Sequence, residues 1–238
     1  MAIRAICFDL GNTLKNYESF PLNWQGFYHD AIVEVLRSIN IEVTADKIQA
    51  GDNVLLKFNT RVNPRDYEVN SETIFEELFH VWEVMDSSEI KTAEETFDSF
   101  FTRQSKLYPE TISILKELRK RNLKTGILTN IAYGMAGERL LRDMADIREY
   151  IETFLPSTEV GFRKPHPQGY ISLTNRLKVD MPECIFVGDE AVDITGANRV
   201  GMVSVLIDRN SHNVNYGQTH TIRSSNDIMQ LIDNTMLE

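Results

Sequence analysis

Three short apolar segments, far apart in the chain, each stop abruptly at a small or acidic polar residue. They end at Asp9, at Thr129 and Asn130, and at Asp189. Such an ending is typical of a buried parallel strand whose carboxyl end opens into a site. In open α/β sheets, ligands bind at those carboxyl ends. The segments therefore predict a parallel sheet with carboxylates and hydroxyls at one edge, which suits a metal ion and an anionic substrate.

The composition indicates a globular protein that meets anions only through a local site. The 238 residues suffice for one large domain or for a domain with a smaller inserted one, and 42% are hydrophobic. A net charge of −10 argues against general binding of nucleic acid or anionic membranes. We find no signal-peptide pattern and no apolar stretch near the ~20 residues of a membrane span. We expect a cytoplasmic protein, either a monomer or a homodimer.

The two cysteines, Cys7 and Cys184, lie in apolar runs that we interpret as core strands. If those strands are neighbours and Asp9 ends level with Asp189, the cysteines are offset by three residues. That offset is roughly 10 Å along a strand, too far for a disulfide bond. The sequence thus predicts two buried, reduced thiols, which fits a cytoplasmic protein.

Residues 17–106 show helical spacing without strand-like runs, which favours an inserted helical bundle. Its apolar faces lie near residues 24–36, 55–58, 74–82 and 97–101. From residue 108 on, strands and helices alternate, which implies a parallel α/β sheet with helices on both faces. We expect strands at 3–9, 123–128, 153–155, 184–187 and 202–207, and helices at 109–121, 134–143, 167–177, 191–199 and 226–233. The α/β domain would comprise residues 1–16 and 107–238, and the helical domain residues 17–106.

Asp9 and the pair Thr129-Asn130 each have a functional and a structural interpretation. As a nucleophile, the Asp9 carboxylate would attack phosphorus and form an aspartyl-phosphate; otherwise it is an acidic cap on a turn. Thr129 and Asn130 offer a hydroxyl and backbone N–H groups to an anion, or merely cap a helix.

The segment 159–167 places Lys164 beside a proline that starts a helix. A positioned ammonium there would neutralise negative oxygens. Arg163 is either a surface cation or a further contact for an anionic substrate, and we interpret His166 as a loop residue.

Asp189 and Asp193 follow Gly188, four residues apart at a predicted turn. Two such carboxylates can share Mg²⁺, which prefers oxygen ligands. The alternative for Asp193 is a cap on the next helix. Mg²⁺ and Lys164 would offset the repulsion between these acids and a phosphate dianion.

Taken together, Asp9-x-x-x-Thr13, Thr129-Asn130, Lys164-Pro165 and Gly188-Asp189-x-x-x-Asp193 resemble the four motifs of the haloacid dehalogenase (HAD) superfamily. The resemblance implies a Rossmann-like α/β core, a mobile helical cap of the C1 type, and a Mg²⁺-dependent hydrolase, usually a phosphatase of small phosphorylated metabolites. By match, Asp9 is the nucleophile, Thr129 a phosphate ligand and Lys164 the charge stabiliser. The implied metal ligands are Asp9, Asp189, Asp193 and the Gly11 carbonyl. The implied substrate contacts are Gly11, Asn12, Thr13, Asn130 and Arg163.

One departure from the family pattern concerns Gly11. The family's phosphatases usually carry a second Asp there as general acid and base, which is typically worth about 10²–10⁴-fold in rate. Its absence predicts a preference for substrates with good leaving groups and slow hydrolysis of the phospho-enzyme. A different base, such as Glu190 or a residue of the helical domain, would remove that slow step.

Two other functions remain open. A 2-haloacid dehalogenase, in which Asp9 attacks carbon, needs neither a metal nor a leaving-group acid, but it does not explain Asp189 and Asp193. A phosphate-binding or regulatory protein with low turnover is supported only by Gly11. Within the helical domain, we expect a hinge at residues 15–17, candidate specificity residues at Arg61, Arg65 and Tyr67, and core positions at Trp24 and Trp82.

Overall fold

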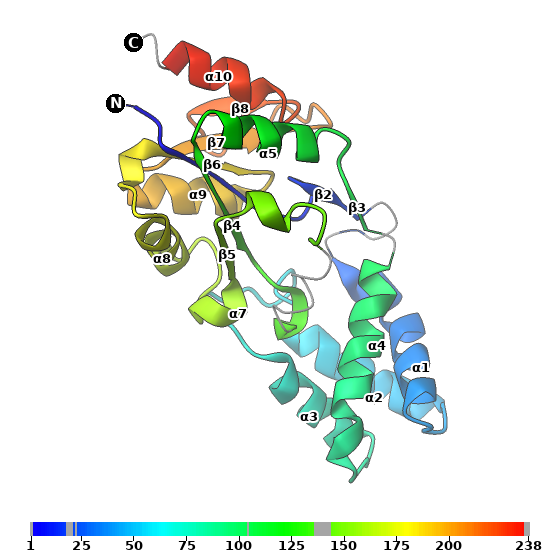
Figure 1. Ribbon diagram of the computed structural model, residues 1–238. Helices are drawn as coiled ribbons and strands as arrows, with labels where there is room; N and C mark the ends of the chain where they lie inside the picture. The colour runs from blue at the N-terminus through cyan, green and yellow to red at the C-terminus, as the bar shows by residue number, and fades with distance from the viewer. Residues whose placement is uncertain (1, 18–20, 22, 104, 136–143, 236–238) are drawn as a thin grey trace. The chain divides into compact units, whose positions relative to one another are not determined.

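The chain forms two compact units, which we call the sheet unit and the helical unit. A computed structural model describes residues 2–17, 21, 23–103, 105–135 and 144–235 (Figure 1). The sheet unit comprises Met1–Asn16, Lys106–Asn130 and Gly137–Glu238, and the helical unit comprises Tyr17–Ser105 and Ile131–Ala136. Residues 131–135, which the sequence assigned to the α/β domain, thus group with the helices. The role of the helical unit as a cap stays a prediction.

The sheet unit contains a parallel sheet of six strands in the order β5-β4-β1-β6-β7-β8. The strands are β1 (Ala5–Phe8), β4 (Lys124–Thr129), β5 (Thr153–Pro156), β6 (Cys184–Gly188), β7 (Val203–Ile207) and β8 (His220–Ile222). This confirms the α/β, Rossmann-type fold class. The edge strand β8 was not predicted, because only its last residue, Ile222, is buried and no apolar run marks it.

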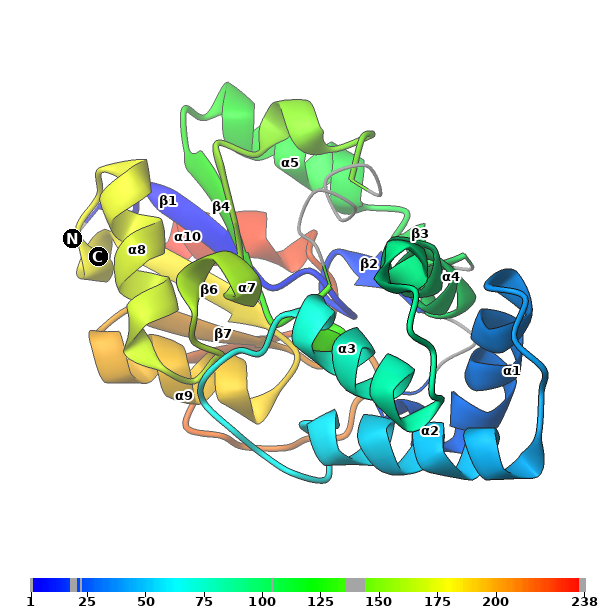
Figure 2. The same cartoon turned by 90° about the horizontal axis from the view of Figure 1, so that it is seen from below.

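Helices cover both faces of the sheet, as Figures 1 and 2 show. They are α5 (Thr111–Lys120), α7 (Ser157–Val160), α8 (Pro167–Leu177), α9 (Ala191–Val200) and α10 (Asp227–Thr235). Alternate residues of β1 serve the two faces: Ile6 and Phe8 pack in the cluster that includes α5 and α10. Ala5 and Cys7 pack in the cluster that includes α8 and α9. The helix expected at 134–143 falls almost wholly outside the described residues.

The cysteines correct one sequence inference. Phe8 pairs with Val187 and Ala5 with Cys184, so Asp9 is level with Gly188 rather than with Asp189. Cys7 and Cys184 are therefore offset by two residues, not three, and point to the same face. Interaction with the Cys184 thiol, together with burial, raises the pKa of Cys7. Both cysteines are free and buried, as expected. The offset of three residues inferred from the sequence was wrong.

A small ribbon stands where the chain passes between the two units. Strand β2 (Lys15–Asn16) pairs antiparallel with β3 (Lys106–Leu107). The chain leaves the sheet unit directly after β2 and returns to it at β3. The pairing therefore holds both connections next to each other, and the expected hinge at residues 15–17 begins inside a strand.

The helical unit contains the four expected helices, and both tryptophans pack inside it. The helices are α1 (Tyr28–Ser38), α2 (Ala45–Phe58), α3 (Ser71–Val81) and α4 (Ile90–Thr102). Trp82 is buried and its indole N–H donates to the Lys47 carbonyl at 2.9 Å. Trp24 stacks on Phe101 with ring centroids 3.9 Å apart. Short 3₁₀ turns occur at Trp24–Phe27, Ser87–Glu89, Ala132–Gly134, Arg148–Tyr150 and Met181–Glu183.

The segment after β4 packs into the helical unit through Tyr133. Its buried ring contacts Tyr28, and the two hydroxyls form a hydrogen bond. The Asn59 amide donates to the Tyr28 hydroxyl at 2.7 Å. The next residue, Gly134, has φ +60°, and a Cβ there would lie 1.8 Å from the Val69 carbonyl oxygen. These contacts explain why residues 131–135 belong with the helices.

No helix within the described ranges has both the length and the apolar character that crossing a membrane requires.

Candidate active site

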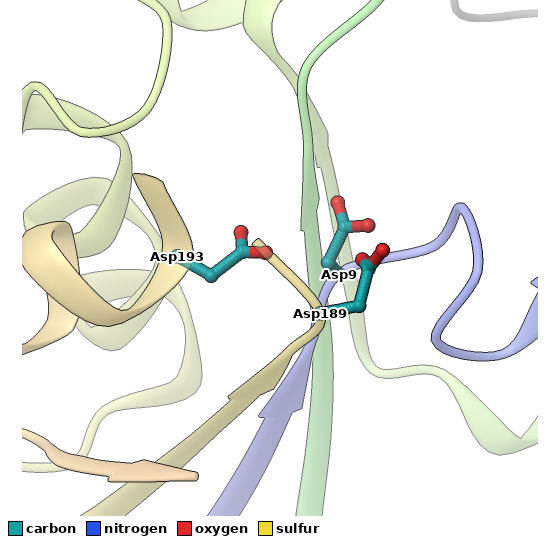
Figure 3. Close-up of side chains that lie close together, drawn as sticks. All are labelled: Asp9, Asp189 and Asp193. Carbon is teal, nitrogen blue, oxygen red and sulfur yellow. The ribbon is translucent and has the colours of Figure 1, made fainter. Parts of the chain in front are cut away.

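Three carboxylates converge at the carboxyl edge of the sheet. Asp9 follows β1, Asp189 follows β6, and Asp193 lies in the first turn of α9 (Figure 3). One ligand oxygen from each lies within 4.8 Å of the others, so a single cation can reach all three. The adjacency follows from the fold, because β1 and β6 are paired neighbours in the centre of the sheet.

Lys164 places its ammonium between two of these acids. Its Nζ lies 2.5 Å from Oδ1 of Asp9 and 2.6 Å from Oδ1 of Asp193. Only 3% of the Lys164 side chain is exposed. Burial alone would lower the pKa of Lys164, but the carboxylates of Asp193 and Asp9 raise it above its ordinary value. The ammonium therefore stays charged beside Asp9 and Asp193.

The cluster holds more carboxyl groups than the Lys164 ammonium can neutralise, and the pKa values of Asp189 and Asp193 are raised. Burial, followed by repulsion from Asp9 and Asp193, raises the pKa of Asp189 to about 8. Burial also raises the pKa of Asp193, and Lys164 opposes that effect. One ammonium faces three carboxylates, and all the donor atoms are hard oxygens. This donor set fits a divalent hard cation such as Mg²⁺, which would let Asp189 ionise.

Gly188 leaves room for the Asp193 side chain. A Cβ at Gly188 would lie 2.3 Å from Asp193 Cγ, so any side chain there would displace the acid. Asp193 Oδ2 accepts a hydrogen bond from the Glu190 N–H at 3.0 Å, and the Glu190 side chain accepts one from the Asp193 N–H. Asp193 therefore helps to cap α9, as one interpretation from sequence predicted, and it also contacts Lys164. Its role as a metal ligand stays a prediction. The carboxylate of Glu190, the alternative base, takes part in this helix cap.

The turn after Asp9 faces the same acids. The Thr13 hydroxyl donates to Asp189 Oδ1 at 3.4 Å. Asn12 adopts a left-handed backbone with φ 52°. The expected substrate contacts of Gly11, Asn12 and Thr13 stay predictions, but their turn lies beside the acidic cluster.

At the end of β4, Thr129 lies one residue beyond the level of Asp9 in the neighbouring strand. It is buried, with 6% of its surface exposed. The Asn130 side chain binds the main chain of Lys164 through both its oxygen and its nitrogen. The two strand ends and the lysine thus form one connected group.

The structure excludes one interpretation of Arg163 and specifies the loop role of His166. Arg163 is buried, so it is not a surface cation. His166 caps α8: its Nδ1 accepts from the Gln168 N–H at 3.2 Å, and its ring stacks on Phe162. His166 therefore has a local role in starting the helix.

The candidate specificity residues lie in the helical unit. The Arg65 side chain is buried and donates to the Phe58 carbonyl at 2.8 Å. Tyr67 is 56% exposed. The substrate roles of Arg61, Arg65 and Tyr67 stay predictions.

Sequence reasoning missed Tyr170, a fully buried residue of α8. Its hydroxyl donates to the carbonyls of Val192 and Asp193, each at 3.2 Å. The tyrosine thus braces the helix turn that carries Asp193. Its only sequence signal was an apolar position on a helix.

With this geometry, the chain can be compared with known proteins. Residues 3–201 match the family model of the haloacid dehalogenase-like hydrolases. The glyceraldehyde 3-phosphate phosphatase of Methanocaldococcus jannaschii is 27% identical over 97% of this chain and 96% of its own length. That of Methanopyrus kandleri is 37% identical over 45% of this chain, and the match spans about half (46%) of that relative. A phosphoglycolate phosphatase of Photorhabdus laumondii is 33% identical over 54% of this chain and 55% of its own length.

Solved structures share the fold. A HAD phosphatase from Thermococcus onnurineus superposes with a TM-score of 0.67 at 24% identity, over 97% of this chain and 98% of that one. A 2-haloacid dehalogenase from Pseudomonas syringae gives 0.71 at 21% identity, over 98% and 99%. The protein belongs to the haloacid dehalogenase-like hydrolases, since the family model covers most of the chain.

Proposed function

We propose that this protein is a Mg²⁺-dependent phosphatase that hydrolyses a small phosphorylated metabolite through an aspartyl-phosphate on Asp9. The observation that carries the proposal is the ion pair of Asp9 with Lys164, at 2.5 Å, inside a cluster of three acids. A carboxylate that lies against a buried ammonium is suited to act as a nucleophile. The phosphatase names of several relatives support the same conclusion.

The proposed reaction has two covalent steps. Asp9 attacks phosphorus, the bond from phosphorus to the ester oxygen breaks, and the leaving oxygen takes up a proton. Water then attacks the phosphorus, the bond from phosphorus to the Asp9 oxygen breaks, and the proton that the water loses passes to solvent. Orthophosphate is released and the Asp9 carboxylate is restored. In both steps the ammonium of Lys164 stabilises negative charge, and the Thr129 hydroxyl donates to a phosphoryl oxygen.

The acidic cluster is the proposed Mg²⁺ site. The groups that would hold the ion are the carboxylates of Asp9, Asp189 and Asp193 and the main-chain carbonyl of Gly11. When bound, Mg²⁺ supplies positive charge to the phosphoryl group. Gly11, Asn12, Thr13, Asn130 and Arg163 are the proposed substrate contacts, and the helical unit is the proposed cap. We also expect a cytoplasmic monomer or homodimer.

The first experiment is a panel of phosphorylated metabolites assayed for phosphate release with Mg²⁺ and with EDTA. Glyceraldehyde 3-phosphate and phosphoglycolate come first, because relatives carry those names. We expect release that needs Mg²⁺ and falls by at least about 10³-fold in Asp9→Asn. Release by Asp9→Asn at the parental rate would refute the mechanism. Halide release from 2-haloacids in EDTA would instead identify a dehalogenase.

Gly11 leaves the ester oxygen without the usual acid, and this has a measurable consequence. Across aryl phosphates of graded leaving-group pKa, we expect the rate to fall steeply as that pKa rises. Gly11→Asp should flatten the dependence and raise the rate on poor leaving groups by about 10²-fold or more. A flat dependence in the parent would mean that another residue donates the proton.

Rapid-mix kinetics separate a slow enzyme from a binding protein. A burst of alcohol product followed by slow turnover is expected if water lacks a base. A stoichiometric burst without turnover would identify the low-turnover alternative. No burst together with fast turnover would point to a base elsewhere, in the helical unit for example.

A further inference from the structure

The turn that follows Asp9, residues 10–15, is held by its own main chain. The N–H groups of Leu14 and Lys15 both donate to the Leu10 carbonyl at 3.0 Å. The Asn12 N–H donates to the Lys15 carbonyl at 2.6 Å. We call residues 10–15 the nucleophile turn. These bonds close the turn. The carbonyls of Asn12 and Thr13 instead accept hydrogen bonds from a residue outside it.

Arg209, two residues beyond β7, supplies those donors. Its Nη2 donates to the Thr13 carbonyl at 2.8 Å, and its Nε donates to the Asn12 carbonyl at 3.3 Å. Nε and Nη2 form one edge of the planar guanidinium, so a single rigid group fixes two successive peptide planes. Asn12 has a left-handed backbone, which is uncommon outside glycine and must be held by its surroundings.

The guanidinium is itself fixed from its other sides. Nη1 pairs with Glu110 Oε1 at 2.6 Å, and the Tyr108 ring stacks 3.5 Å from the guanidinium carbon. Glu110 also accepts from the Ser224 hydroxyl at 3.3 Å. The side chains of Arg209 and Glu110 are 16% and 13% exposed. Because the guanidinium is fixed in this way, it determines where the carbonyls that it binds can lie.

The segment 108–111, which contains Tyr108 and Glu110, also binds the turn near its end, at Leu14. The Leu14 carbonyl accepts from the Tyr108 N–H at 3.1 Å and from the Thr111 hydroxyl at 2.8 Å. Tyr108 therefore both stacks on Arg209 and binds the turn. Three successive carbonyls, those of Asn12, Thr13 and Leu14, are thus anchored to groups outside the turn.

We propose that Arg209 is a positioning residue that sets the nucleophile turn against the acidic cluster. By fixing the Asn12 and Thr13 carbonyls it determines where the Gly11 main chain lies and where the Thr13 hydroxyl meets Asp189. Arg209 lies outside all four sequence motifs. It acts through the turn and is not placed in contact with substrate.

Amide hydrogen exchange tests this role directly. In Arg209→Ala, we expect the peptide covering residues 10–15 to exchange about tenfold faster or more, since a charged hydrogen bond is lost at its carbonyls. The parallel strands should be unchanged. Arg209→Lys keeps the charge but not the fork, so we expect an intermediate result and use it if Arg209→Ala does not fold. The control is Arg223→Ala, because Arg223 binds the Asp208 carbonyl and carboxylate near the same end of the sheet.

Calorimetric titration with Mg²⁺ alone gives a second readout, and this arm rests on the proposed function. Arg209→Ala should raise the dissociation constant for Mg²⁺ about tenfold, and Arg223→Ala should leave that constant unchanged. Guanidinium ion added to Arg209→Ala should restore part of the affinity. If the parent binds no Mg²⁺, the metal proposal fails and the exchange result alone decides the role of Arg209. Parental exchange at residues 10–15 in folded Arg209→Ala and Arg209→Lys would overturn the proposal.

Discussion

The Asn130 carboxamide binds both polar groups of the Lys164 main chain. Its Oδ1 accepts from the Lys164 N–H at 2.8 Å, and its Nδ2 donates to the Lys164 carbonyl at 3.2 Å. Asn130 follows β4, whereas Lys164 lies 34 residues further along the chain. The amide therefore ties the end of a central strand to the residue that holds the Asp9 carboxylate.

Asn130→Ala should consequently impair catalysis through Lys164. We expect a loss of about 1–3 kcal/mol in stability and a fall in kcat larger than the change in KM. Asn130→Asp keeps the oxygen that accepts from Lys164 and should lose less stability. Thermal unfolding and steady-state kinetics measure both effects. A changed KM with an unchanged kcat would instead favour the substrate-binding role expected from the sequence.

Lys164→Met should destabilise the metal-free protein by about 3–5 kcal/mol, because it leaves Asp9 and Asp193 buried without their ammonium. Added Mg²⁺ should then raise the unfolding temperature of the variant more than that of the parent, since the ion takes over part of the charge compensation. Thermal scans with and without Mg²⁺ test this. An equal rise in both proteins would show that the ion and the ammonium do not serve the same acids.

Gly188→Ala should displace Asp193, whose Cγ would lie 2.3 Å from the new Cβ. We expect a stability loss of about 1–3 kcal/mol and a strong loss of phosphate release. Gly26→Ala is the matched control, since nothing lies within 4 Å of a Cβ at Gly26. Parental activity in Gly188→Ala would show that Asp193 need not occupy its observed position.

Asp208, the residue that follows β7, should make the stability of the protein fall at acid pH. Burial by itself would raise the pKa of Asp208, but the N–H groups of His212 and Asn213 and the Arg223 guanidinium lower it to about 2, against 3.8 for an ordinary Asp. The folded state thus favours the ionised form, so this stabilisation is present above about pH 4 and is lost as the pH falls toward 2.

Asp208→Asn should therefore unfold at a lower temperature than the parent at neutral pH, with a difference that shrinks below about pH 4. The comparison is best made in a His212→Gln background, which removes the imidazole whose Nδ1 lies 3.3 Å from Asp208 Oδ1. A difference that stays constant down to about pH 3 would contradict the assignment.

Much of the sheet unit could be predicted from local pattern. Apolar runs that end at Asp9, Thr129 and Asp189 marked three central strands, and helical periodicity marked α5, α8 and α9. These signals are local because burial repeats along each element with its own period. The family resemblance then gathered the four motifs into one site, and the structure places the acids of two motifs within reach of one cation.

Other features depend on contacts that no periodicity reports. The one-residue shift between Asp9 and Asp189 follows from strand register, which also brings Cys7 close to Cys184. Residues 131–135 were expected in the α/β domain, but Tyr133 packs against Tyr28 in the helical unit.

The sequence by itself determined the class of fold and predicted the acids, hydroxyl and ammonium of the candidate site, because strand ends and the turn residues after them occupy consecutive positions. Only the tertiary structure decided what holds these groups in place. Asn130 binds the Lys164 main chain, Gly188 leaves space for the Asp193 side chain, and Arg209 binds carbonyls of the turn after Asp9. Each of these is a contact between segments that are distant in the chain or a matter of excluded space. Such contacts arise when the elements pack, and the pattern of any single element does not contain them.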